Sequence, residues 1–418
     1  MKLSQLPCAG KTVLVRVDYN VPLELKRNQW CVRDARRLRA SFRTIEHLLK
    51  LNCKVVLLSH LGRPTEKGEE KFSLRSVYRY LQKNTDWSIQ FIDDYVQNTA
   101  EAKKMIAASA PGSVFLLENL RFNAGEKKND PAFVKTLASL GEVFVNDAFS
   151  SCHRAHASVV GLAKKMPAAM GLSLETEVHA FGNLLQNPVH PFVVVVGGAK
   201  ISDKIDPIVN LSRIADAVLI GGGVANNFLK AVGIAVQKSY LQDTPADLKK
   251  EGLDYVELAN QIISANQGER MLKDGYIPLP KIIYPVDVVA AISPQARATT
   301  KIELTSSNVN DKNGKLMYLD IGPKTARLYR ELILQAETVF WNGPMGMFEQ
   351  APFASGTREV ARAVAKTGAV TVVGGGDTLA ALDKFGFASQ VDYATMAGSA
   401  ALEFLAGKKL PGLVALEK

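Results

Sequence analysis

The sequence is poor in cysteine and contains no long hydrophobic run. Its widely spaced cysteines include no C-x-x-C pair, and they are Cys8, Cys31, Cys53 and Cys152. This spacing excludes a cysteine-based zinc site and a disulfide framework, so a reducing cytoplasmic location is the simplest expectation. The longest strand-like apolar run, 191–196, is far shorter than the roughly 18 residues that cross a bilayer. The first residues also lack the apolar core of a signal peptide, and no membrane association is expected.

Two common nucleotide-binding motifs are also missing. Gly10, Lys11 and Thr12 imitate the end of a P-loop, but Gln5 stands where that motif needs its first glycine. The glycine triplets at 221–223 and 374–376 lack the third glycine of the dinucleotide-binding fingerprint. The interpretation of the chain as a dinucleotide-dependent dehydrogenase therefore lacks its main sequence evidence.

Length and charge indicate two domains, one of them basic. A chain of 418 residues exceeds one ordinary core, and its hydrophobic fraction of 47% is typical of soluble globular proteins. Residues 1–180 hold 27 lysines and arginines against 18 acidic residues, which leaves 24 against 23 for the remainder of the chain. The excess of the +10 net charge thus lies in the first half, where it favours a compact phosphorylated ligand.

Apolar runs alternate with helical patterns along the first half. Strands are predicted at 13–17, 54–58, 88–92, 114–117 and 143–145, and helices at 35–51, 74–82, 100–109 and 131–140. Such alternation indicates a mostly parallel, doubly wound α/β sheet. Ligands bind beyond the carboxyl ends of the strands in these sheets, so the residues after each strand are the candidates for a site.

Basic and polar side chains follow these strands, and they are Asp18, Asn20, His60, Arg63, Arg121 and Arg154. Taken singly, each arginine is better explained as a solvated surface residue, and each histidine is more often a hydrogen-bonded structural group than a catalyst. Several arginines at one rim, however, form a clamp for phosphate or carboxylate oxygens. The five arginines between 33 and 43 stay ambiguous, because helical spacing prevents them all from facing one way.

Glycine follows most of the strands predicted in the second half. These strands are 192–196, 217–220, 285–291, 316–319, 338–341 and 369–373, and glycine follows five of them. We expect the five to belong to one sheet, whose edge allows close backbone approach to a nucleotide. A helix over 172–186 ends at Asn187-Pro188 and joins the halves, and 245–263 is also predicted as helical.

The last of these junctions is the one most suited to phosphate. The apolar run 369–373 leads into Gly374, Gly375, Gly376, Asp377 and Thr378, after which a helical pattern begins. Backbone N–H groups at such a turn face an anion, and Asp377 can hold the cation that accompanies a nucleotide. A tight turn without a ligand explains this single stretch equally well, but the recurrence of similar junctions favours the phosphate site.

Nine motifs occur in the order typical of one family: RVDYNVP, SHLGRP, ENLRF, NDAF with HRAH, GGAKISDKI, GGGVA, DIGPKT, WNGPMGMFE and GGGDT. Together they resemble phosphoglycerate kinase across nearly the whole chain. The resemblance implies two Rossmann-like α/β domains with mostly parallel, doubly wound sheets, joined by a helix and facing across a cleft. It also implies reversible, direct in-line phosphoryl transfer between 1,3-bisphosphoglycerate and MgADP, giving 3-phosphoglycerate and MgATP after hinge closure. A cytoplasmic monomer follows from the same resemblance.

The resemblance also implies a division of the chain. Residues 1–172 form a phosphoglycerate-binding domain, 173–187 the interdomain helix, and 188–401 a nucleotide-binding domain. Residues 402–418 are expected to pack back on the first domain.

The matched motifs carry the family's site residues onto this sequence. The implied ligands of the phosphoglycerate are Asp18, Asn20, Arg37, His60, Arg63, Arg121 and Arg154. The implied nucleotide site consists of Gly198, Ala199, Lys204, Gly221, Asn342, Pro344, Glu349, Gly375, Gly376, Asp377 and Thr378. Catalytic roles are implied for Arg37, Lys200, Lys204, Gly375 and Gly376, a Mg²⁺ contact for Asp377, and a ribose contact for Glu349.

The sequence departs from the family pattern at several positions. Met396 and Ala397 stand where glycines are usual, Ser150-Ser151-Cys152 replaces Gly-Thr-Ala, and Arg43 replaces a proline. If the turn requires positive φ at Met396 or Ala397, each costs on the order of 1–3 kcal/mol. An alternative is therefore a family member that binds both ligands but turns over poorly. Nucleic-acid binding by the basic half ranks last, because a lysine-rich tail and zinc-finger spacing are both missing.

Overall fold

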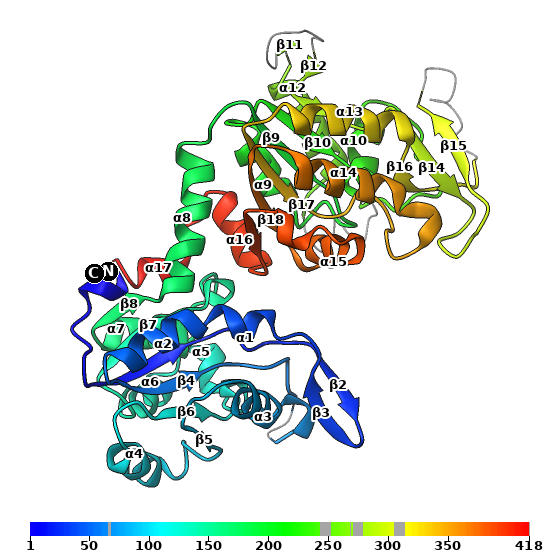
Figure 1. The fold of residues 1–418 in the computed structure, drawn as a ribbon. Helices are drawn as coiled ribbons and strands as arrows, with labels where there is room; N and C mark the ends of the chain where they lie inside the picture. Colours follow the sequence, from blue (N-terminus) through cyan, green and yellow to red (C-terminus); the bar gives the residue numbers. More distant parts are fainter. Residues whose placement is uncertain (66–67, 243–251, 268, 271–278, 305–313, 418) are drawn as a thin grey trace. The chain divides into compact units, whose positions relative to one another are not determined.

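The computed structural model describes residues 1–418 except 66–67, 243–251, 268, 271–278, 305–313 and 418 (Figure 1). The chain divides into two compact units. Unit 1 comprises residues 1–179 and 409–418, and unit 2 comprises residues 180–408. Among the helices that the structure describes, none is both long enough and apolar enough to span a bilayer.

The unit boundaries lie a few residues from the expected domain boundaries. The first falls inside helix α8 (Leu172–Gln186), which was expected to join the domains. The second divides the expected 402–418 segment, because residues 402–408 belong to unit 2. Helix α16 (Ser399–Leu405) packs there against α9 (Ile205–Leu211), and Asn210 Nδ2 donates to Leu405 O at 2.7 Å.

Unit 1 is built on a six-stranded parallel sheet with the order β5-β6-β4-β1-β7-β8. Its strands are β1 (Thr12–Arg16), β4 (Lys54–Leu58), β5 (Ile89–Ile92), β6 (Val114–Leu117), β7 (Val143–Asn146) and β8 (Ala168–Met170). Val13 of β1 lies opposite both Val55 and Val143, so β1 is central and apolar on both faces. Such double burial is typical of parallel strands covered by helices, and the predicted sheet class is confirmed.

The helices of unit 1 follow the predicted alternation, with one break. They are α1 (Arg36–Ala40), α2 (Phe42–Lys50), α3 (Arg75–Asn84), α4 (Thr99–Ala108), α5 (Gly125–Lys128), α6 (Pro131–Ala138), α7 (Leu162–Lys165) and α17 (Pro411–Val414). The single helix predicted over 35–51 is wrong, because the chain interrupts it at Ser41. The Ser41 hydroxyl donates to Leu38 O at 2.8 Å and contacts the buried Tyr19 hydroxyl at 3.1 Å. An antiparallel hairpin of β2 (Leu23–Lys26) and β3 (Gln29–Val32) precedes α1 and has no counterpart in the prediction.

Unit 2 is built on a second six-stranded parallel sheet with the order β13-β10-β9-β17-β18-β19. Its strands are β9 (Phe192–Val196), β10 (Ala217–Ile220), β13 (Ile282–Ile283), β17 (Thr338–Asn342), β18 (Val370–Gly374) and β19 (Tyr393–Thr395). Its longer helices are α10 (Val224–Ala231), α12 (Tyr255–Ala265), α13 (Pro323–Leu334), α14 (Ser355–Lys366) and α15 (Gly376–Phe385). The helix predicted over 245–263 lies partly outside the described residues, and α12 covers its second part.

The expectation that five glycine-terminated strands share one sheet is wrong. Strand β16 (Met317–Ile321), which precedes Gly322, pairs antiparallel with β14 (Asp287–Ala291). With β15 (Thr300–Glu303) they form a separate three-stranded sheet at one end of unit 2 (Figure 1). A short apolar run contains no information on the direction of its partner, so the sequence pattern could not distinguish the two sheets.

Candidate functional site

A cluster of polar side chains lies beyond the carboxyl end of β1 in unit 1. Arg37 Nη1 donates to Asp18 Oδ2 at 2.7 Å and to Asn20 O at 3.3 Å. The Ser150 hydroxyl donates to the same Asp18 oxygen at 2.6 Å, and the N–H of Asn20 donates to Asp18 Oδ1 at 3.1 Å. The Asp18 carboxylate is therefore held by donors from three separate segments, with the Arg37 guanidinium directed toward it.

A chain of hydrogen bonds connects this cluster to Arg121. Asn20 Oδ1 accepts from the N–H of Gly62 at 2.8 Å, and Arg121 Nη1 donates to the carbonyl of Gly62 at 2.5 Å. The Arg121 side chain is buried, yet its Nε and Nη2 have no hydrogen-bond partner among the residues that the structure describes. Burial, reinforced by the neighbouring cations Arg154 and Arg16, lowers the pKa of Arg121 to about 10.

His60 and Arg154 complete this basic region. Burial lowers the pKa of His60 well below its usual value, and the charges of Arg16, Arg121 and Arg154 act in the same direction. Arg154 Nε donates to His153 Nε2 at 3.0 Å. The more exposed Arg63 lies close enough to oppose the charge on Arg121.

The structure therefore brings all seven predicted acid-binding side chains to one region of unit 1: Asp18, Asn20, Arg37, His60, Arg63, Arg121 and Arg154. Several cations lie near one another with few compensating carboxylates, which disfavours their charged forms. A small ligand carrying both phosphate and carboxylate would relieve this repulsion and supply acceptors for the unpaired guanidinium donors.

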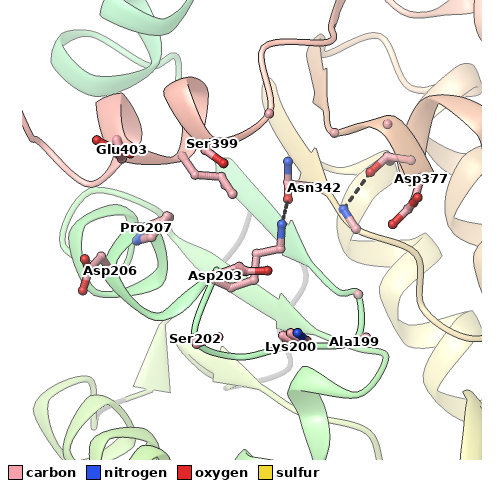
Figure 2. Close-up of a pocket in the computed structure, with 18 of the residues that line it drawn as sticks. Ala199, Lys200, Ser202, Asp203, Asp206, Pro207, Asn342, Asp377, Ser399 and Glu403 are labelled. Carbon is pink, nitrogen blue, oxygen red and sulfur yellow. Dashed lines mark hydrogen bonds between the residues drawn. The ribbon is translucent and has the colours of Figure 1, made fainter. Parts of the chain in front are cut away.

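A cavity of about 600 Å³ lies at the carboxyl ends of β9, β17 and β18 in unit 2 (Figure 2). Its lining includes most of the predicted nucleotide residues, namely Gly198, Ala199, Lys204, Asn342, Pro344, Gly375, Gly376, Asp377 and Thr378, together with Lys200. Residues that the sequence did not single out also line it, among them Asp206, Ser399, Glu403 and Lys408.

Lys204 projects from the loop after β9 toward the end of β17. Its Nζ donates to Asn342 Oδ1, a contact drawn in Figure 2. Burial lowers the pKa of Lys204, while the charges of Asp203 and Asp377 act in the opposite direction. The ammonium group of Lys204 is partly buried, and with one amide acceptor among the described residues it retains two donors for a phosphate.

Helix α15 presents its first turn to the same cavity. Its first helical hydrogen bond runs from the N–H of Leu379 to the carbonyl of Gly375 at 3.1 Å, so the preceding N–H groups of 376–378 have no acceptor within the helix. Gly376 has open space around it, which permits close approach of an anion. The N–H of Gly375, in contrast, donates to Thr395 O at 3.3 Å.

A second cavity of about 500 Å³ adjoins the first, and the two share Gly198, Ala199, Pro344 and Asp377. Glu349 lines this second cavity, as do the apolar side chains Leu229, Val288, Tyr318 and Met345. An apolar wall with a carboxylate at its edge suits a base and a sugar. Gly221 lines neither cavity, because it packs against the Met345 side chain.

Several glycines of this site are required by packing between loops. A Cβ atom on Gly343 would lie 2.2 Å from the carbonyl oxygen of Gly197, and one on Gly223 would lie 2.5 Å from that of Ala199. The N–H of Gly198 already donates to Pro344 O at 2.8 Å. Backbone-to-backbone contact between loops therefore requires glycine at these positions.

The part of the chain that the structure describes contains no cluster of three or more His, Cys, Asp or Glu side chains able to hold a metal ion. Mg²⁺, however, is commonly held by one or two carboxylates together with phosphate oxygens and water. Asp377 supplies one carboxylate at the junction of both cavities. The donor set therefore fits a magnesium ion that arrives with a nucleotide.

Two further residues of the unit 1 region are not among the predicted site residues. Arg16 is the last residue of β1. Its charge within the otherwise apolar run Val13–Val17 is the sequence feature that could have identified it as part of the site. Ser150 stands out in the sequence only as a departure from a family pattern, and no spacing rule connects it to Asp18.

The unusual turn near Met396 contains no strained non-glycine residue. Positive φ occurs at the retained Gly398, at 56°, while Met396 and Ala397 do not have positive φ. Because neither residue has positive φ, replacing the usual glycines by Met396 and Ala397 causes no backbone strain of this kind. Backbone strain at Met396 and Ala397 is therefore not an argument for a member with poor turnover.

Comparisons with known proteins agree with this architecture. A family model described as phosphoglycerate kinase matches residues 3–408. A phosphoglycerate kinase from Moorella thermoacetica is 46% identical over 100% of this chain and 98% of its own, and one from Deinococcus radiodurans is 45% identical over 99% and 94%. The solved phosphoglycerate kinase structure from Coxiella burnetii has a TM-score of 0.82 at 37% identity, and that from Pyrococcus horikoshii 0.81 at 33%. Both structural matches extend over 100% of this chain and 98% of the solved chain.

The fold defines the chain as a two-unit α/β protein with Rossmann-like parallel sheets. Full-length similarity at this level then identifies its family. The chain belongs to the phosphoglycerate kinase family.

Proposed function

We propose that the chain transfers a phosphoryl group reversibly between 1,3-bisphosphoglycerate and MgADP, giving 3-phosphoglycerate and MgATP. The basic region of unit 1 binds the acid, and the two adjoining cavities of unit 2 bind the nucleotide. Family membership and the name of the relatives support the reaction, and the geometry of each unit supports the assignment of its ligand.

The observation that carries the proposal is the buried, incompletely paired guanidinium of Arg121. A buried charge without partners is costly, so such a group is expected where a ligand supplies the missing acceptors. Arg63 and Arg154 lie near it, and Asp18 lies on the far side of Asn20. In this arrangement the arginines bind the phosphate oxygens. Asp18 accepts a hydrogen bond from the hydroxyl of the glycerate, and Asn20 donates one to its carboxylate.

On the nucleotide side, Lys204 and Lys200 contact the phosphates, and the N–H groups at the start of α15 point at the same oxygens. Glu349 binds the ribose at the edge of the apolar cavity. When Mg²⁺ is bound at Asp377, it neutralises charge on the phosphate oxygens.

The chemistry requires no covalent intermediate on the protein. A carboxylate oxygen of 3-phosphoglycerate attacks the terminal phosphorus of ATP, and the bond from that phosphorus to the ADP oxygen breaks. In the other direction, the β-phosphate of ADP attacks. Arg37, Lys204 and the N–H of Gly376 stabilise charge on the oxygens of the migrating group. Because the acid site and the nucleotide site belong to different units, transfer requires the two bound ligands to be brought together.

A coupled assay that follows ATP formation from 1,3-bisphosphoglycerate and ADP tests the proposal. We expect ATP formation that depends on added magnesium. Absence of ATP under conditions in which calorimetry shows both ligands bound would contradict it.

We also propose that the chain acts as a monomer in the cytoplasm. The separated thiol groups fit a reducing compartment, and Cys8, Cys53 and Cys152 are buried. Light scattering after size-exclusion chromatography tests the oligomeric state, and a dimer at micromolar concentration would contradict it.

A further inference from the structure

A buried arginine lies beneath the acid-binding region. The Arg16 side chain is only 1% exposed, and its guanidinium contacts four groups. Nε donates to Ser158 Oγ at 3.0 Å, Nη1 donates to the Val17 carbonyl, and Nη2 donates to Ser151 Oγ at 3.1 Å. Nη2 also lies 2.7 Å from His60 Nδ1. The arginine therefore connects the core of unit 1 with one predicted substrate ligand.

Glu126 supplies the compensating charge for this arginine. The Ser158 hydroxyl accepts from Arg16 and donates to Glu126 Oε1 at 2.7 Å, while the N–H of Ser158 donates to Glu126 Oε2 at 3.1 Å. Glu126 is also 1% exposed, and its carboxylate lies 3.6 Å from His156 Nδ1. The pKa of Glu126 is lowered in spite of its burial by contacts with His156, Arg16 and Ser158. The pair is thus maintained as charged groups that cannot turn toward solvent.

The contact between Arg16 and His60 determines which ring nitrogen is protonated. A guanidinium donates hydrogen bonds and accepts none, so the facing Nδ1 of His60 must be the acceptor. A protonated imidazole would place two donors against each other at 2.7 Å. We infer that Arg16 holds His60 as the neutral tautomer with its proton on Nε2, so that His60 is an uncharged hydrogen-bond donor in the site. The inference rests on the proposed function in one respect: the group that accepts the hydrogen bond from His60 Nε2–H is an oxygen of the phosphoglycerate.

The other charges around His60 act in the same direction. Arg121, Arg154 and His156 face it as well as Arg16, and together with burial they lower its pKa well below the usual value. Binding of the acid therefore does not depend on protonation of this histidine near neutral pH. Arg16 acts here as a positioning residue, because it contacts His60 and has no role at the reacting atoms.

Long-range ¹H–¹⁵N spectra of the full chain with ¹⁵N-labelled histidine test the inference directly. The chain has six histidines, and a His60→Gln variant identifies the signal. We expect one neutral tautomer with the proton on Nε2 and no titration between about pH 5 and pH 8, the range in which an ordinary histidine changes charge. A proton on Nδ1, or titration near about pH 6.5, would overturn the inference.

Two variants separate positioning from general stability. In Arg16→Met, His60 loses its fixed donor, so we expect a mixture of the two neutral tautomers and a KM for 3-phosphoglycerate raised about tenfold or more. The KM for MgADP should not change. The matched control Ser151→Ala removes another acceptor of the same guanidinium and should leave the tautomer of His60 unchanged. A single Nε2–H tautomer persisting in Arg16→Met would refute the role of Arg16.

The wild-type spectrum alone decides the question if Arg16→Met does not fold. The proposed function is tested separately by the coupled assay. The expected tautomer without ATP formation would leave the inference intact and remove the function, whereas ATP formation with a titrating His60 would do the reverse.

Discussion

The two units build their proposed anion sites from different groups. In unit 1, the donors are side chains, and the buried residues Arg16, Glu126 and Ser158 lie beneath them, with Arg16 in contact with His60. In unit 2, the cavity is formed largely by strand-to-loop turns that pack backbone against backbone, as at Gly197 and Gly343. Lys204 is a partly buried cation there, and it donates to Asn342 at the end of a strand.

This difference has a physical basis in the ligands proposed for each unit. A small acid with several charged groups is recognised by matched cations, which only side chains supply. The phosphates of a nucleotide are long enough to lie along a turn, where N–H groups and a helix terminus face them. Substitutions should therefore act on charge in unit 1 and on backbone geometry in unit 2.

The largest expected effect follows from removing one cation of unit 1. Arg37→Ala should lower kcat by about 10³ or more, because an arginine on the migrating phosphoryl group contributes on that scale. Binding of MgADP, measured by calorimetry, should be nearly unchanged. The neighbouring Arg36→Ala is the matched control, since Arg36 pairs with the partly exposed Asp34 at 2.5 Å. A kcat for Arg37→Ala close to that of the control would show that Arg37 has no catalytic role.

The corresponding change in unit 2 alters backbone geometry. Gly375 has φ of 96°, and an added Cβ would lie 3.1 Å from Asn342 Nδ2. Gly375→Ala should lower the free energy of unfolding by on the order of 1–3 kcal/mol and weaken MgADP binding, with 3-phosphoglycerate binding unchanged. Gly368→Ala is the control, because Gly368 has ordinary backbone angles and open space. Urea unfolding and calorimetry measure both effects, and equal results for the two variants would contradict the prediction.

Ionisation of Asp147 in unit 1 should make the stability of the protein depend on pH. Burial raises the pKa of Asp147 to about 7, although its Oδ1 accepts from the N–H groups of Ser173 and Leu174 at 2.9 and 3.1 Å. Its Oδ2 has no hydrogen-bond partner within the described part of the chain. Between the unfolded pKa of about 3.9 and the folded value, the folded state binds more protons, so stability falls as pH rises through this window.

Asp147→Asn keeps the Oδ1 acceptor and removes the titration. We therefore expect the free energy of unfolding of the wild type to decrease between about pH 5 and pH 8 by about 1–3 kcal/mol relative to the variant. Denaturant unfolding at several pH values checks this. Parallel pH profiles for the two proteins would show that Asp147 does not titrate in this range.

The smallest expected effect tests the donor that the family pattern lacks. Ser150→Ala removes one of two donors to Asp18 Oδ2, while Arg37 stays in place. The KM for 3-phosphoglycerate should rise roughly two- to tenfold, as for one hydrogen bond, with little change in kcat. Ser150→Thr keeps the hydroxyl and should restore the wild-type KM. An unchanged KM in Ser150→Ala would mean that the Ser150 hydroxyl is not needed to hold Asp18.

The fold was predictable where strands are short, apolar and separated by helical periodicity. Strands β4, β6, β9 and β10 and helix α8 have the predicted bounds, because buried strands and amphipathic helices differ in their apolar repeat. Strand β16 was assigned to the wrong sheet, since pairing direction depends on distant segments. The break at Ser41 depends on its contact with Tyr19, which no local pattern specifies.

The candidate site was predictable to the extent that chemistry follows each strand. The carboxyl ends of parallel strands converge, so Asp18, His60 and Arg121 could be expected together from their positions alone. The supporting residues were not predictable in this way. Glu126 lies on the short helix α5 and Ser158 on a later π-helix (Ala157–Gly161), and only their burial beside Arg16 reveals a function.

By itself, the sequence determined the family and the sheet class, and it led to most of the charged residues proposed for the sites, because apolar periodicity and local motifs are properties of neighbouring positions. Tertiary structure alone decided which donors are engaged and which are open. The N–H of Gly375 donates to Thr395 O, and the backbone of Gly343 packs against that of Gly197. The guanidinium of Arg16 contacts the imidazole of His60. These facts depend on distances between segments far apart along the chain, which arise only when both sheets have packed.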